Sequence, residues 1–141
     1  MTETWALGQT GEELAADYLS KHGYQILHHN WNLHRGCELD LVARKNGELH
    51  FFEVKTRSRV SDTFGSPEEA VDARKQRHIQ SAISYYTSYY KIDPDTPIHL
   101  DVIAIIYRGE DDYELKLLED VYFFEFSRSQ YKGRQHGWRY R

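Results

Sequence analysis

The stretch ELDLVARKNGELHFFEVKT, residues 38–56, decides the fold of this chain. Asn46 and Gly47 at its centre are the strongest short signal for a two-residue type I′ turn, because both central positions of that turn require a positive φ. Two runs of strand length, 38–43 and 48–56, flank the turn, and apolar residues recur in both. The stretch therefore predicts an antiparallel β-hairpin.

The turn also fixes which residues of the two strands face each other. Counting outward from it places Asp40 opposite Glu53. Glu38 then faces Lys55, and because strand side chains alternate, these four side chains point to one face. A slip of one residue would expose the apolar side chains predicted for the other face, so the register is well specified. Those apolar residues are Leu39, Leu41, Phe52 and Val54.

The predicted pairing of Asp40 with Glu53 is costly unless a cation is present. Side chains in facing strand positions lie about 4.5–5.5 Å apart at Cβ, and two carboxylates at that separation repel by about 1–3 kcal/mol. A divalent cation removes this penalty, and paired carboxylates with open water positions suit Mg²⁺. Lys55 could orient a water or stabilise charge on a phosphate. The pairing alone leaves a second interpretation open, a solvated hairpin face with a Glu38–Lys55 ion pair.

The rest of the chain alternates between helical and strand patterns. A helix is predicted at 10–22, ending at Gly23, and a second one from the Ser66 capping box to about Tyr90. Further strands are predicted at 25–33, at 98–107 with both faces buried, and at 113–118, with 121–126 closing the core. The order of helix, three strands, helix and two strands predicts an α/β layered domain whose central mixed β-sheet is flanked by helices.

Length and composition bound the class of protein. The 141 residues, 40% apolar and 28% charged, fit one globular domain, predicted at 1–126, followed by a basic tail at 127–141. No apolar stretch is long enough to span a membrane, and the start of the chain has no secretory signal pattern. Because Cys37 is the single cysteine, no internal disulfide can form, and the cytoplasm is the expected compartment.

Several motifs in order resemble one known family. Asp40 followed by Glu53-Val54-Lys55 looks like the PD-(D/E)xK signature of restriction-endonuclease-like nucleases. The surrounding motifs resemble the YraN-like family, which is similar to archaeal Holliday-junction resolvases. These motifs are Gly8-x-x-Gly11-Glu12-x-x-Ala15-x-x-Tyr18-Leu19, the segments 38–43 and 52–57, Gly65-x-Pro67-Glu68-Glu69-Ala70-Val71 and Asp101-Val102-Ile103. The resemblance covers roughly residues 5–107 and implies a restriction-endonuclease-like fold.

The resemblance also implies a function and a site. Asp40 and Glu53, with the Val54 carbonyl, would hold Mg²⁺ or Mn²⁺, and Lys55 would assist the attacking water. Glu12 matches an additional acidic residue of the resolvases, although by itself it looks like a solvated helix residue. Two basic residues, Arg57 and Lys75, are expected to contact nucleic acid. The implied activity is metal-dependent hydrolysis of DNA, structured or branched, and because resolvases act as dimers, a homodimer is left open.

Other interpretations of the function remain open at this point. A nucleic-acid-binding module without turnover, an RNA-directed nuclease and a protein-interaction scaffold all fit the composition. The net charge of −4 argues mildly against a nucleic-acid partner, whereas the tail carries five basic residues and no acidic one.

The eight histidines show no ligand spacing, so no zinc site is predicted. Asp101 is expected in the region of the carboxylate pair or paired with an Arg or Lys. Of the tyrosines at 85–90, one helical row is expected in the core and the other exposed.

Overall fold

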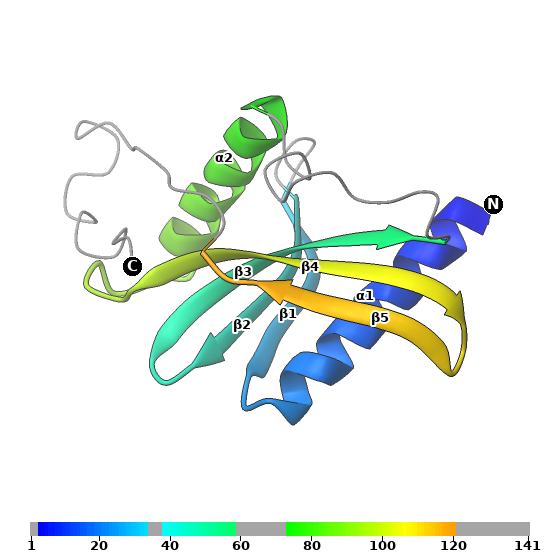
Figure 1. Cartoon of the computed structure of the whole chain (residues 1–141). Helices are drawn as coiled ribbons and strands as arrows, with labels where there is room; N and C mark the ends of the chain where they lie inside the picture. The colour runs from blue at the N-terminus through cyan, green and yellow to red at the C-terminus, as the bar shows by residue number, and fades with distance from the viewer. Residues whose placement is uncertain (1–2, 34–37, 59–72, 121–141) are drawn as a thin grey trace.

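The computed structural model describes residues 3–33, 38–58 and 73–120. Its elements follow the predicted order of helix, three strands, helix and two strands (Figure 1). They are α1 (Glu3–Lys21), β1 (Gln25–Asn32), β2 (Glu38–Lys45), β3 (Glu48–Arg57), α2 (Ala73–Tyr89), β4 (Ile98–Gly109) and β5 (Asp112–Leu118). The predicted capping box at Ser66, the segment 121–126, Cys37 and the basic tail lie outside the described residues.

The five strands form one sheet in the order β1-β2-β3-β4-β5. Only β3 and β4 run parallel, and α2 lies in the connection between them, as a parallel crossover requires. The other three neighbouring pairs are antiparallel. This is the predicted α/β layered domain with a central mixed sheet, and it is consistent with a restriction-endonuclease-like fold.

Each face of the sheet is covered by one helix. The cluster on the α2 side contains Ile79, Ile83 and Tyr86 of the helix, and the cluster on the α1 side contains Ala15 and Leu19. Strand β4 contributes to both clusters, and all its residues from Ile98 to Ile105 are buried. The prediction of a strand buried on both faces is confirmed.

The helix boundaries differ slightly from the predicted ones. Helix α1 begins at Glu3, earlier than the predicted start at residue 10, because no proline interrupts the segment before it. It ends where predicted: Gly23 has a φ of 90°, and the amide of Tyr24 donates to the Leu19 carbonyl at 3.0 Å.

The hairpin register is confirmed over most of its length. Asn46 and Gly47 have φ values of 52° and 77°, as a type I′ turn requires. The ladder between β2 and β3 runs from Lys45↔Glu48 to Leu41↔Phe52 in the predicted register.

The alternation of faces breaks just beyond the last ladder pair, at Asp40. The prediction that Leu39 shares the face of Leu41 is wrong, because Leu39 packs in the α2-side cluster and Leu41 in the α1-side cluster. The cause lies partly in β1, where Asn30, between the residues paired with Leu39 and Leu41, has a φ of 47°. This irregularity lets the Asp40 side chain reach the backbone of β3.

Candidate functional site

Asp40 and Glu53 lie together where the β2–β3 ladder ends. The Val54 amide donates to Asp40 Oδ2 at 2.9 Å, so this carboxylate takes a position that a backbone acceptor would occupy in a regular ladder. The Asp40 and Glu53 side chains are also hydrogen-bonded to each other. Because a carboxylate can only accept, two such groups in contact need either a shared proton or a cation between them.

Burial makes both carboxyl groups weaker acids. It raises the pKa of Asp40, an effect that the hydrogen bond from Val54 and the charge of Lys75 partly offset. Burial, followed by the nearby charge of Asp40, raises the pKa of Glu53 to about 7. Two carboxylates in one desolvated site cannot both ionise cheaply. The site therefore favours either a proton or a cation.

Two lysines supply positive charge to this pair. Lys75 Nζ on α2 lies 3.2 Å from Glu53 Oε2, and although burial acts to lower the pKa of Lys75, the nearby carboxylates raise it overall. The pKa of Lys55 is lowered, mainly by burial and then by the charge of Arg57. The charges of Glu53 and Asp40 act on Lys55 as well. The two lysines thus differ, because Lys75 is paired with a carboxylate, whereas Lys55 is subject to the positive charges of Arg57 and Lys75.

Glu12 approaches the same site from α1. Burial, and then the charge of Asp40, raises the pKa of Glu12 to about 7, and its side chain is hydrogen-bonded to that of Asn30. The interpretation of Glu12 as a solvated helix residue is wrong, because the Glu12 side chain is half-buried and the charge of Asp40 raises its pKa. No sequence pattern singled out Asn30, whose left-handed backbone conformation is one that asparagine tolerates.

The remaining predicted site residues have local roles in the structure. Val54 contributes its amide to Asp40, and metal ligation by its carbonyl stays a prediction. Arg57, half-buried at the end of β3, donates from a guanidinium nitrogen to the Thr56 carbonyl at 3.2 Å. Lys75 forms an ion pair with Glu53, and its contact with nucleic acid stays a prediction.

The raised pKa of Glu53 predicts how stability changes with pH in chelator-treated protein. Between about pH 4.5 and 7 the folded chain keeps the Glu53 proton while the unfolded chain releases it. Rising pH therefore favours unfolding, and this group should lower the free energy of unfolding by about 1–3 kcal/mol across that window. Glu53→Gln should flatten this dependence in urea denaturation at pH 5 and pH 8.

The exposed Glu13 on the same helix as Glu12 provides a control for the pH experiment. Glu13→Gln should follow the pH dependence of the unmodified chain. If the free energy of unfolding of Glu53→Gln depends on pH as steeply as that of the unmodified chain, then the Glu53 carboxyl does not cause the pH dependence of stability.

The position of Glu12 depends on close packing between α1 and β3 at Gly11. A Cβ built on Gly11 would overlap Thr56 Oγ1 and lie 3.0 and 3.1 Å from Thr56 Cβ and Cγ2. Gly11→Ala should therefore displace α1 and destabilise the fold by about 1–3 kcal/mol. Gly8 is the matched control, because no atom lies within 4 Å of a Cβ built there.

The two alanine variants should change stability in opposite directions. Gly8→Ala should stabilise the helix by about 0.5–1 kcal/mol, since alanine loses less backbone entropy than glycine. Urea denaturation of both variants measures the difference. Equal effects of the two substitutions would contradict the close contact at Gly11.

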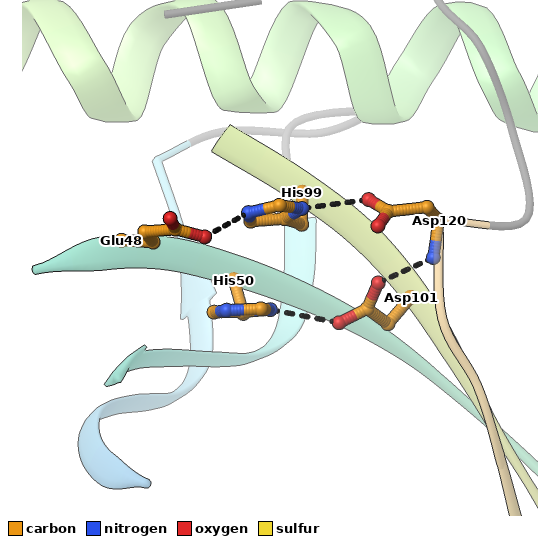
Figure 2. A network of polar contacts seen from close by, with 5 residues as sticks. All are labelled: Glu48, His50, His99, Asp101 and Asp120. Carbon is orange, nitrogen blue, oxygen red and sulfur yellow. Dashed lines mark hydrogen bonds and ion pairs between the residues drawn. The ribbon is translucent and has the colours of Figure 1, made fainter. Parts of the chain in front are cut away.

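A second group of polar residues lies at the hairpin end of the sheet. Within the described ranges, Glu48, His50 and His99 each bring one potential metal-ligand atom, and these atoms lie within 4.8 Å of one another (Figure 2). No ligand set was predicted among the histidines, because His50 and His99 are 49 positions apart and match no short ligand spacing. The parallel pairing of β3 and β4 places His50 directly beside His99, which no local pattern reveals.

Asp101 belongs to this second group. It is fully buried, and its Oδ2 accepts from His50 Nδ1 at 2.9 Å (Figure 2). The prediction that Asp101 lies near the carboxylate pair or binds an Arg or Lys is therefore wrong. It follows Leu100, which packs in the α2-side cluster, so alternation along β4 turns Asp101 to the opposite face.

The tyrosines of α2 and the residue after it divide only in part as predicted. Tyr86 is buried in the core, and Tyr90 just beyond the helix packs against it with ring centroids 4.6 Å apart. Tyr85 and Tyr89 form the exposed row, with 47% and 66% of their surface accessible. The predicted exposed row is confirmed, whereas the core row is confirmed only at Tyr86, because Tyr90 is 39% exposed.

Within residues 3–33, 38–58 and 73–120, neither helix has the length and apolarity needed to span a membrane.

Comparison with known proteins shows the family. The model of the Uncharacterised protein family UPF0102 matches residues 11–105, which include Glu12, Asp40, Glu53 and Lys55. A UPF0102 protein of Parabacteroides distasonis is 42% identical over 117 residues, covering 83% of this chain and 92% of that protein. One of Bacteroides thetaiotaomicron is 43% identical over 124 residues, covering 87% and 97%.

A more distant relative spans nearly the same region. A UPF0102 protein of Caldicellulosiruptor bescii is 35% identical over 117 residues, which cover 82% of this chain and 96% of that protein. The motifs that resemble the YraN-like family thus lead to the correct group. The chain belongs to the Uncharacterised protein family UPF0102.

Proposed function

We propose that this protein is a metal-dependent nuclease of the restriction-endonuclease-like superfamily that hydrolyses phosphodiesters in structured or branched DNA. The observation that carries the proposal is the hydrogen-bonded pair of half-buried Asp40 and buried Glu53, with Lys55 and Lys75 close enough to influence its charge. A perturbed carboxylate pair beside lysines is a marker of functional sites. Its position at the end of a strand pair gives it a fixed geometry.

The residues present fit Mg²⁺ or Mn²⁺. The donor atoms that surround the site are carboxylate oxygens of Asp40, Glu53 and Glu12, the type that hard divalent cations prefer. Two of these carboxyl groups have pKa values of about 7, so near neutral pH little energy is needed to exchange their protons for a cation. When bound, the metal would activate a water molecule and offset negative charge on the phosphate.

The protein side chains would divide the remaining work. Asp40, held by the Val54 amide, and Glu53 would keep the ligand oxygens in place. Lys55 would orient the attacking water and stabilise the charge that develops on the phosphate. The water oxygen bonds to phosphorus as the bond to the leaving sugar oxygen breaks, and that oxygen takes up a proton. Glu12, hydrogen-bonded to Asn30, would position the water shell on the α1 side.

Nucleic acid would approach this site through charge rather than through base recognition. Arg57 lies at the end of β3, two residues beyond Lys55, so both could face the same phosphate backbone. Lys75 could exchange its ion pair with Glu53 for a phosphate once a cation neutralises the carboxylates. A homodimer would suit a branched substrate, which presents two equivalent strands.

One observation favours a second candidate, a nucleic-acid-binding module without turnover. In the structure the Lys75 ammonium itself neutralises Glu53, with 3.2 Å between Nζ and Oε2. If this pair persists in solution, the lysine takes the place of the metal. The chain would then bind nucleic acid without hydrolysing it.

A cleavage panel distinguishes these functions. The full chain is incubated with labelled single-stranded, duplex, flapped and four-way DNA and with duplex RNA, each with Mg²⁺, Mn²⁺ or chelator. Metal-dependent cleavage of the branched DNA is the expected result. Binding without cleavage under every condition would favour the module, and cleavage confined to RNA would make the chain an RNA-directed nuclease.

A further inference from the structure

The second polar group, Glu48, His50 and His99, has the makeup of a metal site. Glu48 and His50 come from β3, and His99 comes from the neighbouring β4. The two histidines are paired residues of the parallel ladder, and their rings stack with centroids 4.4 Å apart and planes 13° from parallel. His50 and His99 are almost completely buried, whereas the Glu48 side chain is 28% exposed. The sheet itself therefore brings two imidazoles and a carboxylate together.

A second carboxylate orients each imidazole. His50 Nδ1 donates to Asp101 Oδ2 at 2.9 Å, and His99 Nδ1 donates to Asp120 Oδ1 at 2.7 Å. Asp101 is held in turn by the Asp120 amide, which donates to its Oδ1 at 2.8 Å. Metal-binding histidines characteristically have their other ring nitrogen fixed by a carboxylate in this way.

The orientation leaves the Nε2 atoms for another partner. His99 Nε2 lies 2.6 Å from Glu48 Oε1, and Figure 2 shows the second nitrogen of His50 on the side away from Asp101, where His99 meets Glu48. A divalent cation can be accommodated between the Glu48 oxygen and the His99 nitrogen, because the partly exposed Glu48 side chain can adjust its torsions.

The charge of the cluster also favours a cation. Glu48, Asp101 and Asp120 are three acidic residues, and two imidazoles stacked at 4.4 Å would repel each other if both were protonated. Negative charge extends beyond these groups. Burial first, and then Asp101 and Glu119, raises the pKa of the adjoining Tyr24 to about 12.

A cavity of about 400 Å³ adjoins the cluster, and its lining includes Tyr24, Lys45 and Glu119 in addition to the three potential ligands. Three protein ligands leave a fourth tetrahedral position for water or a small ligand. Two histidines and one glutamate with an open position form one of the ligand sets that hold zinc in enzymes.

We propose that Glu48, His50 and His99 bind a divalent transition metal of the zinc class, with one coordination position open to this cavity. Imidazole nitrogen favours such metals over Mg²⁺, which prefers an octahedral set of oxygens. The site is separate from the Asp40–Glu53 pair. Glu48 and Glu53 are five positions apart along β3, about 16 Å, and their side chains point to opposite faces of the sheet.

The test is metal binding by the untagged full-length chain after treatment with chelator. Co²⁺ and then Zn²⁺ are titrated in the presence of excess Mg²⁺, which occupies oxygen-rich sites. One Co²⁺ per chain should bind with the intense visible absorption of a tetrahedral ion, and Zn²⁺ should displace it. Substitution of either histidine, His50→Gln or His99→Gln, should weaken binding at least about 100-fold, and Asp101→Asn about 10–100-fold.

Two controls make the outcome decisive. His29→Gln removes an exposed histidine elsewhere, and Asp17→Asn removes an exposed carboxylate outside both groups, so both should bind Co²⁺ like the unmodified chain. The histidine variants must fold, which circular dichroism in chelator measures. If they do not, Glu48→Gln at the more exposed ligand replaces them and should abolish the tetrahedral spectrum.

Unchanged Co²⁺ binding in the folded ligand variants, or no binding by the unmodified chain below millimolar metal, would overturn the proposal. Neither result depends on nuclease activity.

Discussion

Asp40→Asn is expected to abolish metal-dependent cleavage, with a loss of at least about 10²-fold, without destabilising the metal-free protein. The substitution removes a charge that raises the pKa of Glu53, and the asparagine oxygen can still accept from the Val54 amide. The metal-free variant should therefore be as stable as the unmodified chain or slightly more stable.

The same variant should lose most of its stabilisation by metal. A ligand that binds only the folded chain adds about 2.7 kcal/mol at 100 times its dissociation constant. Thermal unfolding with and without Mg²⁺ measures this gain. The matched control is Asp17→Asn, which alters an exposed ion pair with Lys21 and should leave both cleavage and the Mg²⁺ effect intact.

The opposite pattern would remove the nuclease proposal. If Mg²⁺ and Mn²⁺ change neither the unfolding temperature nor the DNA, and Asp40→Asn destabilises the metal-free fold, the carboxylate pair is structural. The binding module without turnover would then be the better account of the chain.

Lys55→Met is expected to separate metal binding from turnover. Lys55 lies near the carboxylates, but in the structure Lys75 forms the ion pair with Glu53. Removing the Lys55 charge should therefore preserve stabilisation by Mg²⁺ while lowering single-turnover cleavage by about 10²–10³-fold, the range for loss of one electrostatic contact to the transition state.

Two other lysine variants sharpen this prediction. Lys116→Met, at an exposed position of β5, should retain full cleavage. Lys75→Met removes the competing ammonium from Glu53 and should tighten Mg²⁺ binding. Cleavage by Lys55→Met at the unmodified rate would show that Lys55 has no part in the reaction, whatever the metal does.

Local sequence determined the elements that carry the site. The Asn46-Gly47 turn fixed the hairpin register from Lys45↔Glu48 to Leu41↔Phe52, because only residues that tolerate a positive φ can form this turn. The continuous apolar run of β4 likewise predicted its burial between two layers. The turn depends only on the backbone preferences of two adjacent residues. The burial of β4 can be read from the run of apolar residues within one strand.

The candidate site was predictable only in part. The register brought Asp40 near Glu53, and the family motifs added Glu12, but the pairing is not a regular ladder pair. The Asp40 side chain takes the Val54 amide instead, and the accompanying break in alternation moves Leu39 to the other face. Such a break depends on the conformation of the neighbouring strand β1, which the hairpin sequence does not contain.

Tertiary structure alone decided which polar residues far apart in the sequence meet. Lys75 reaches Glu53 because α2 packs across the sheet, and Glu12 meets Asn30 because α1 covers the other face. His50 and His99, 49 positions apart, become neighbours through the parallel pairing of β3 and β4. A parallel pair needs a long crossover, so its register is set by the packing of the intervening helix and both cores rather than by any local pattern. The sequence thus determined the strands and the carboxylate pair, and the packing of helices and parallel strands decided their ionic partners and the histidine cluster.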